Sequence, residues 1–219
     1  MTLRTALHAL PTNIAVLSLA ACGSASPAPA GPSSPDTTSP SPVAVTTPGG
    51  DPCQNGGRSC IMNLTSPPPT VTDPTKTYTA LVHTSRGDFT IALDIKAAPV
   101  TVNNFVYISQ HHFYDGLTFH RVVPDFVVQG GDPNGDGTGG PPYKLPNETN
   151  PAPWNRGSLG MASSAAGVSG SQFFVVTKDS PFLSSNGVYN HFGTVTSGMD
   201  VVDKIQVGDQ ILTVTISGG

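Results

Sequence analysis

The stretch FHRVVPDFVVQGGDP, residues 119–133, indicates both the fold class and a binding surface. Most of its residues are β-branched or aromatic, which is typical of strands that pack into a core. Pro124 interrupts the run, so two short strands joined by a turn are expected. Period-two alternation puts Val127 and Gln129 on one face of the second strand. From this stretch alone, Arg121 and Gln129 face either water or a ligand groove in which their polar groups find partners.

Further short strands are predicted on both sides of this stretch. YTALVHTSRGDFTIALD, residues 78–94, is typical of a hairpin with a tight turn at Ser85-Arg86-Gly87, because apolar and polar residues alternate along FTIALD. Four more strands are expected at GSLGMAS, SQFFVVT, HFGTV and ILTVTISG. The chain shows no internal repeat.

Two helices are predicted among these strands. Pro99 stands at the favoured first position of VTVNNFVYISQHHF, in which Val102 and Phe105 share one helix face. The second helix lies in GMDVVDKI, where Ser197 and Asp200 have the spacing of a capping box. Many short strands, only two helices and frequent glycine and proline predict an antiparallel barrel or sandwich dominated by β structure.

The amino terminus has the pattern of an export signal. Arg4 precedes a short apolar run that is broken by Pro11 and Asn13, so the run is unsuited to span a membrane. It ends in Leu-Ala-Ala-Cys at residues 19–22, which resembles the lipobox of bacterial lipoproteins, where cleavage precedes a cysteine that receives lipid. The alternative is an ordinary secretory signal in which Cys22 is incidental. Both interpretations predict export from the cytoplasm.

The chain is expected to have three parts. Residues 1–21 form the signal peptide, residues 22–75 form a linker that begins with the lipidated Cys22, and residues 76–219 form the folded domain. The linker is rich in Pro, Ser, Thr and Gly and has too little apolar surface to offset the entropy of ordering, so it is predicted to be a disordered tether. The expected location is extracytoplasmic, with a lipid anchor in the bacterial cell membrane.

Two cysteines lie inside this linker. Cys53 and Cys60 are separated by a segment containing Asn55-Gly56-Gly57, which supplies a flexible turn. Outside the cytoplasm such a pair is expected to form a disulfide, and free thiols are the alternative. No histidine lies nearby, so a metal site is not expected here.

Charge and side-chain spacing exclude several classes of partner. Ten Lys+Arg against fourteen Asp+Glu, with no basic run, give no surface for nucleic acid. Residues 132–137 resemble the start of a calcium loop, but Tyr143 stands where a glutamate ligand is needed. His111 and His112 are adjacent and point apart on a helix, so they cannot share a metal. Neither a metal nor a cofactor is expected.

Four segments together resemble the cyclophilin-type peptidyl-prolyl cis–trans isomerases. They are FHRVVPDFVVQGGD, GDGTGG, GSLGMAS followed by GSQFF, and FLSSNGVYNHFGTV, and the resemblance covers about residues 77–217. It implies an eight-stranded, closed antiparallel β-barrel capped by two α-helices. It also implies a monomer that isomerises Xaa-Pro bonds in proline-containing polypeptides and assists protein folding. The alternative is a domain of the same fold that binds such segments without turnover.

The resemblance also implies the residues of the site. The catalytic residues would be Arg121, Phe126 and Gln129. The substrate groove would be lined by Val127, Gly137, Ala162, Ser163, Ser164, Gln172, Phe174, Phe182, Leu183 and Tyr189.

Several positions depart from the pattern of many family members. Val127 replaces a methionine, Ser163 an asparagine, Phe182 a tryptophan and Tyr189 a histidine, while Asp125 replaces a glycine in the turn. Because Phe182 lacks an indole N–H, the family's inhibitor cyclosporin is expected to bind with reduced affinity. Isomerase activity is expected to survive these changes.

Overall fold

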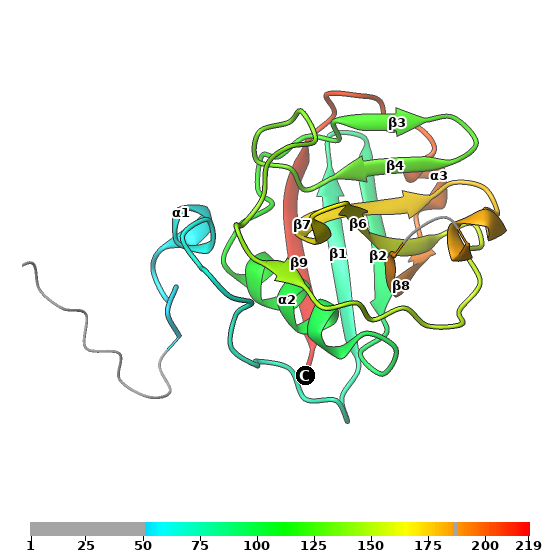
Figure 1. Ribbon diagram of the computed structural model, residues 1–219. Coiled ribbons are helices and arrows are strands. Elements are labelled where there is room, and N and C mark those ends of the chain that lie inside the picture. Colours follow the sequence, from blue (N-terminus) through cyan, green and yellow to red (C-terminus); the bar gives the residue numbers. More distant parts are fainter. Residues whose placement is uncertain (1–50, 186–187) are drawn as a thin grey trace, which may run out of the picture. The chain divides into compact units, whose positions relative to one another are not determined.

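The structure is a computed structural model that describes residues 51–185 and 188–219 (Figure 1). The predicted signal peptide, Cys22 and the linker up to residue 50 lie outside the described residues. The described part of the chain is all-β with few helices, as expected, and is built on one strongly curled antiparallel sheet. None of its helices has the length and hydrophobicity needed to cross a bilayer.

The sheet has nine strands. They are β1 (Tyr78–Thr84), β2 (Gly87–Leu93), β3 (Arg121–Val123), β4 (Val127–Gly130), β5 (Lys144–Leu145), β6 (Ser158–Ser164), β7 (Gly167–Val176), β8 (Asn190–Ser197) and β9 (Ile211–Gly218). Their spatial order is β3-β4-β7-β6-β8-β2-β1-β9, and β5 pairs with β7 beside this path. The helical elements are α1 (Gly57–Ile61), α2 (Pro99–Gln110), α3 (Met199–Val202) and the 3-10 helix η1 (Pro181–Ser184).

The expectation of a closed eight-stranded barrel is wrong, because the sheet is open with β3 and β9 at its two ends. β3 is only three residues long and offers little backbone to a further partner. The chain before β3 meets the chain before β9 through an isolated bridge between Thr118 and Gln210. The backbone N–H of Gly116 also donates to the carbonyl of Ile211 at 2.7 Å. These few bonds join the ends of the sheet without forming a ladder.

Helix α2 begins at Pro99, as predicted, and Glu148 satisfies the first backbone N–H groups that a helix leaves unpaired. Its carboxylate accepts hydrogen bonds from the N–H groups of Val100 and Thr101, each at 2.8 Å. A helix also forms at α3, but the expected capping box does not. Gly198 occupies the N-cap with a φ of 83°, and no side chain caps this end.

The main core lies between α2 and the concave sheet. Phe105 of α2 packs edge-on against Phe173 of β7 at 5.8 Å between ring centroids, and it also contacts Phe192 of β8. Successive side chains of a strand point to opposite faces, so Phe174 points away from α2. β7 therefore separates the α2 side of the sheet from a second, smaller apolar cluster that contains Phe174.

The expectation of a disordered tether is wrong for residues 51–75, which pack against α2. Asn103 of α2 accepts the backbone N–H of Val71 at 2.7 Å and donates its amide to the carbonyl of Pro69 at 3.0 Å. Ile61 is fully buried in the main core. The average composition of the linker concealed these few residues, whose burial against α2 offsets the entropy of ordering the segment.

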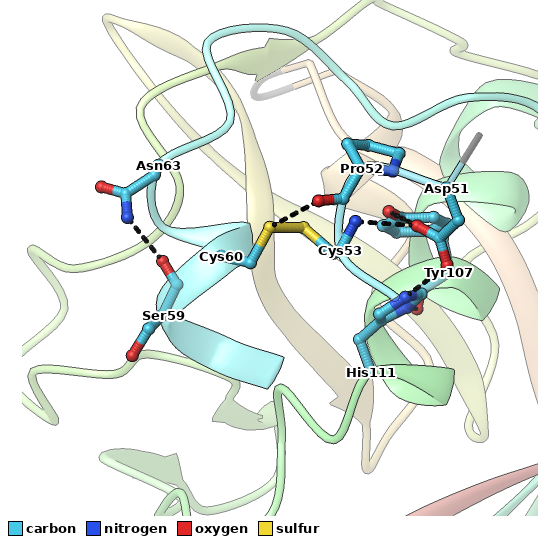
Figure 2. Close-up of a disulfide and its surroundings, with 8 residues drawn as sticks. All are labelled: Asp51, Pro52, Cys53, Ser59, Cys60, Asn63, Tyr107 and His111. Carbon is cyan, nitrogen blue, oxygen red and sulfur yellow. Dashed lines mark hydrogen bonds and ion pairs between the residues drawn. A yellow bond between two sulfur atoms is a disulfide. The ribbon is translucent and has the colours of Figure 1, made fainter. Parts of the chain in front are cut away.

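A disulfide closes the first part of this segment, residues 51–64, which we call the clamp. Figure 2 shows Cys53 bonded to Cys60, with Asp51 beside the last turns of α2. Oδ1 of Asp51 accepts a hydrogen bond from the hydroxyl of Tyr107, and Oδ2 lies 2.9 Å from Nε2 of His111. Asp51, which stands two residues before Cys53, therefore attaches the clamp to the end of α2.

We predict that Cys53→Ser combined with Cys60→Ser lowers the free energy of unfolding by about 2 kcal/mol, because the short disulfide loop restrains the unfolded chain. Urea denaturation of wild type under oxidising conditions and of the double variant measures the difference. Ser59→Ala is the matched control, since Ser59 is exposed on the same clamp. Equal midpoints for wild type and the double variant would contradict this role for the disulfide.

Candidate active site

The strand register places one residue from each of four adjacent strands in a single row across the sheet. Arg121 of β3 lies opposite Gln129 of β4, Gln129 opposite Phe174 of β7, and Phe174 opposite Gly160 of β6. Directly opposed residues in antiparallel strands project from the same face. Arg121 and Gln129 thus share the face of Phe174, which is the face opposite α2.

This face holds a cavity of about 260 Å³. Its lining consists of Arg121, Phe126, Val127, Gln129, Ala162, Ser163, Phe174, Leu183 and Tyr189. An adjoining groove shares Gln129, Ala162 and Ser163 with the cavity and adds Gly137, Ser164 and Gln172. The two polar residues of the opening stretch therefore face a ligand groove, and the structure brings together every expected site residue except Phe182.

Phe182 lies at the rim of the cavity. Its side chain is 48% exposed, and its ring packs against Phe126 at 5.2 Å between centroids. The groove also includes Lys144 and Ser169, which sequence reasoning did not select. They are strand residues of β5 and β7 and carry no local signal of a site.

Trp154 supports the floor of the cavity and was not expected there. Its ring stacks on Phe174 at 5.5 Å and meets Tyr189 edge-on at 6.2 Å. Together with Val127, Val176 and Leu183, these rings form the smaller apolar cluster of the structure. Trp154 lies in a loop rich in proline and asparagine, where no periodicity assigns it a face; its identity as the single tryptophan of the chain was the available signal.

Gly160 makes room for these rings. An added Cβ would lie 2.4 Å from Cζ of Phe174 and 2.7 Å from the ring of Trp154. Ordinary carbon contacts lie at about 3.5–4.0 Å, so any side chain at this position would displace one of the rings. Phe174 can keep its position in the cavity because Gly160, which lies opposite it on β6, has no side chain.

Two glutamine amides connect the glycine-rich loop at residues 132–139 to Arg121, and we call this pair the amide relay. Gln172 donates both amide hydrogens to backbone carbonyls, to Gly137 at 3.0 Å and to Gly139 at 2.8 Å. Its oxygen therefore faces Gln129, which donates to it at 3.1 Å. The oxygen of Gln129 in turn accepts a hydrogen bond from Nη1 of Arg121 at 3.3 Å. The loop carbonyls therefore fix which end of the Gln172 amide faces Gln129, and Gln172 in turn fixes the amide of Gln129.

The guanidinium of Arg121 is held by this relay and by an aromatic ring, and not by an acidic residue. Its Cζ lies 5.9 Å from the ring centroid of Phe126. Within the described residues, no carboxylate forms an ion pair with it. A guanidinium has five N–H groups and stays charged at all relevant pH values, so donors remain for a ligand in the cavity.

The turn between β3 and β4 places Phe126 at the cavity. The N–H of Phe126 donates to the carbonyl of Val123 at 3.1 Å, with Pro124 and Asp125 in the middle of the turn. Asp125 has a φ of 55°, a left-handed conformation that glycine adopts without strain. Asp125 tolerates this conformation better than a β-branched residue would, since short polar side chains visit it.

The carboxylate of Asp132 binds the backbone of its own loop. It is almost fully buried and accepts the backbone N–H groups of Asn134 at 2.9 Å, Asp136 at 3.1 Å and Gly137. The part of the chain that the structure describes contains no group of three His, Cys, Asp or Glu residues placed to hold a metal. The arrangement fits chemistry that needs one fixed cation beside an apolar cavity.

Comparison with known proteins agrees with this geometry. The model of the family described as "Cyclophilin type peptidyl-prolyl cis-trans isomerase/CLD" matches residues 79–217. A peptidyl-prolyl cis–trans isomerase of Synechococcus elongatus is 45% identical over 139 residues, which cover 63% of this chain and 94% of that protein. Peptidyl-prolyl cis–trans isomerase B of Bacillus subtilis is 48% identical over 125 residues, covering 56% of this chain and 86% of that protein.

A solved structure shows the same fold. The cyclophilin-type isomerase of Cryptosporidium parvum has a TM-score of 0.59 and 28% identity, and the match covers 64% of this chain and 98% of that one. The same protein was also crystallised in the presence of the dipeptide Ala-Pro. The chain belongs to the cyclophilin-type peptidyl-prolyl cis–trans isomerases. It is accordingly an isomerase of prolyl peptide bonds.

We predict that Gly160→Ala lowers kcat/KM for an Xaa-Pro peptide by about tenfold or more, because the new methyl group displaces Phe174 or Trp154 from the cavity floor. Gly193→Ala is the matched control. There an added Cβ also makes a short contact, 2.8 Å from the carbonyl of Ala92, but between β8 and β2. Comparable losses of activity in two equally folded variants would contradict the special role of Gly160.

Proposed function

We propose that this isomerase acts as a monomer on Xaa-Pro bonds of polypeptides outside the cytoplasm and assists their folding, held to the bacterial cell membrane by lipid on Cys22. The Leu-Ala-Ala-Cys pattern at residues 19–22 supports the lipid anchor. The disulfide between Cys53 and Cys60 supports the compartment, since disulfides persist in oxidising surroundings and are rare in the cytosol.

The reaction requires neither a nucleophile nor a metal. The barrier of about 18–20 kcal/mol to rotation about a peptide bond comes from lost amide resonance, so the enzyme must bind the twisted amide better than either planar form. In the twisted amide the prolyl nitrogen becomes pyramidal and carries a lone pair. A permanently charged donor beside that nitrogen stabilises the twisted state more than the planar ones.

One observation carries the assignment of this donor: Arg121 reaches the cavity with only one N–H donated to the amide relay and with no acidic partner among the described residues. Its remaining N–H groups are available to the prolyl nitrogen. The relay orients the guanidinium before substrate arrives, so no free energy is spent on reorganisation during rotation.

The cavity walls supply the second part of the mechanism. Phe126, Phe174 and Leu183 offer apolar surface that fits a proline ring, while Gln129 and the groove beside Ser163 offer polar groups to the peptide. One charge-assisted hydrogen bond contributes about 1.5–3 kcal/mol, whereas an acceleration near 10⁵-fold needs about 7 kcal/mol. Holding the proline ring while the preceding residue rotates would provide the remainder.

We predict that Arg121→Ala lowers the catalysed cis–trans exchange rate by about tenfold or more with a smaller change in peptide affinity, because the donor acts mainly on the twisted amide. NMR exchange spectroscopy on one Xaa-Pro peptide measures the rate and the affinity together. Phe126→Ala is the matched comparison and is expected to weaken both, since it removes apolar contact with the ring. Equal exchange rates for wild type and Arg121→Ala would overturn the role of Arg121, whereas no enhancement of exchange by wild type would favour a domain that binds proline segments without turnover.

The location is tested separately from the chemistry. Cys22→Ser is expected to abolish labelling by a fatty-acid analogue in bacterial cells and to move the protein from the membrane fraction to the soluble fraction, because stable attachment needs acyl chains. Cys53→Ser controls for nonspecific thiol labelling. An unlabelled, soluble wild-type protein would contradict the lipid anchor while leaving the isomerase assignment intact.

The rim residue Phe182 bears on inhibition. We propose that cyclosporin binds this protein more weakly than a relative with tryptophan at this position, because the exposed phenyl ring offers no N–H donor. Phe182→Trp should tighten the measured dissociation constant by about threefold to tenfold, the equivalent of one hydrogen bond. Phe182→Leu serves as the control without a ring, and an unchanged constant in Phe182→Trp would refute the explanation.

A further inference from the structure

His120 precedes Arg121 in the chain and contacts the glycine-rich loop. Its ring is partly buried, and both ring nitrogens are shielded from solvent without a hydrogen-bond partner in the described part of the chain. A Cβ added to Gly137 would lie 3.9 Å from Nε2 of His120, so the imidazole lies beside this loop residue. This partly buried, titratable group has no role in the proposed mechanism.

Gly137 belongs to both hydrogen-bond systems of the loop. Its backbone N–H donates to the carboxylate of Asp132, and its carbonyl accepts a hydrogen bond from Gln172 at 3.0 Å. Any rotation of the Gly137 peptide units would therefore change the first acceptor of the amide relay. The relay continues through Gln129 to Arg121, so His120 lies beside one of the two residues whose carbonyls orient Gln172.

Burial is the largest influence on the imidazole, and it lowers the pKa of His120 below its ordinary value of 6.5. Three charged groups also act on the ring: Asp132 and Asp136 on the loop raise this pKa, and Arg121 on β3 lowers it. The neutral ring thus fits its surroundings at neutral pH. A protonated ring would be a partly buried cation with two acidic neighbours and one basic neighbour.

We propose that His120 makes the orientation of Arg121 sensitive to acid: its protonation displaces Gly137 and disengages the amide relay. The inference rests on the role proposed above for Arg121. The protonated ring attracts the carboxylate of Asp132, which otherwise accepts the backbone N–H groups of the loop. The loop then loses the bonds that hold the Gly137 carbonyl toward Gln172.

The pH dependence of catalysis tests the proposal. For wild type, kcat/KM should fall as the pH is lowered from about 7.5, by about threefold or more once His120 is mostly protonated, because its protonated fraction rises only below the ordinary pKa. His120→Gln removes the titrating group and keeps a polar side chain of similar length. This variant should retain most of the activity at about pH 7.5 and lose the acidic decline.

His191→Gln is the matched control. Within the described residues, His191 is the other histidine whose pKa burial lowers; it lies on β8 opposite Gly160, and its ring centroid is 5.0 Å from that of Trp154. The acidic decline should persist in His191→Gln. If it persists in His120→Gln and disappears in His191→Gln, the decline belongs to the cavity floor and the proposal is wrong.

A second measurement follows the relay without relying on activity. The side-chain amide signals of Gln172 and Gln129, recorded by ¹⁵N NMR, should shift with pH in wild type along the titration of His120, and should stay constant over the same range in His120→Gln. Constant amide signals in wild type would overturn the coupling. If these signals titrate but the Arg121→Ala variant remains fully active, the relay responds to His120 and the proposed function of Arg121 is wrong.

Discussion

The alternation of side chains along β7 is the constraint on which the remaining structure depends. Phe173 and Phe174 are consecutive, so one must point toward α2 and the other away from it. Phe173 joins the main core against Phe105, and Phe174 forms the wall of the cavity over Trp154. The same strand thereby stabilises the domain with one aromatic ring and offers the next ring to a ligand. A shift of the register by one residue would exchange the two roles.

The polar part of the site obtains its order from the backbone of the glycine-rich loop. Side-chain amides are ambiguous donors and acceptors until one end is fixed, and the carbonyls of Gly137 and Gly139 fix Gln172 by accepting both of its hydrogens. The orientation then passes through Gln129 to Arg121. This origin explains how an exposed guanidinium can be aligned without an ion pair, which would have reduced its charge toward a substrate.

The resemblance of four sequence segments to the family implied most of the site, whereas strand alternation alone left Arg121 and Gln129 facing either water or a ligand groove. Val127 and Gln129 share a face in the structure as period two requires, and Arg121 joins them through pairing within one short hairpin. Closure of the barrel could not be judged in this way, since it depends on contacts between β3 and β9, which are far apart in the chain. Trp154 was missed because a residue in an irregular loop has no period. The order of residues 51–75 was missed because four buried residues and a few bonds to Asn103 are invisible in an averaged composition.

The position of Trp154 has a spectroscopic consequence. It is the single tryptophan of the chain, and it lies buried under the cavity in contact with Phe174 and beside His191. The indole emission of the protein therefore originates at one known point, directly beneath the surface that a proline ring would cover. The molecule contains its own optical probe of that surface, and a nearby imidazole whose protonation can quench it.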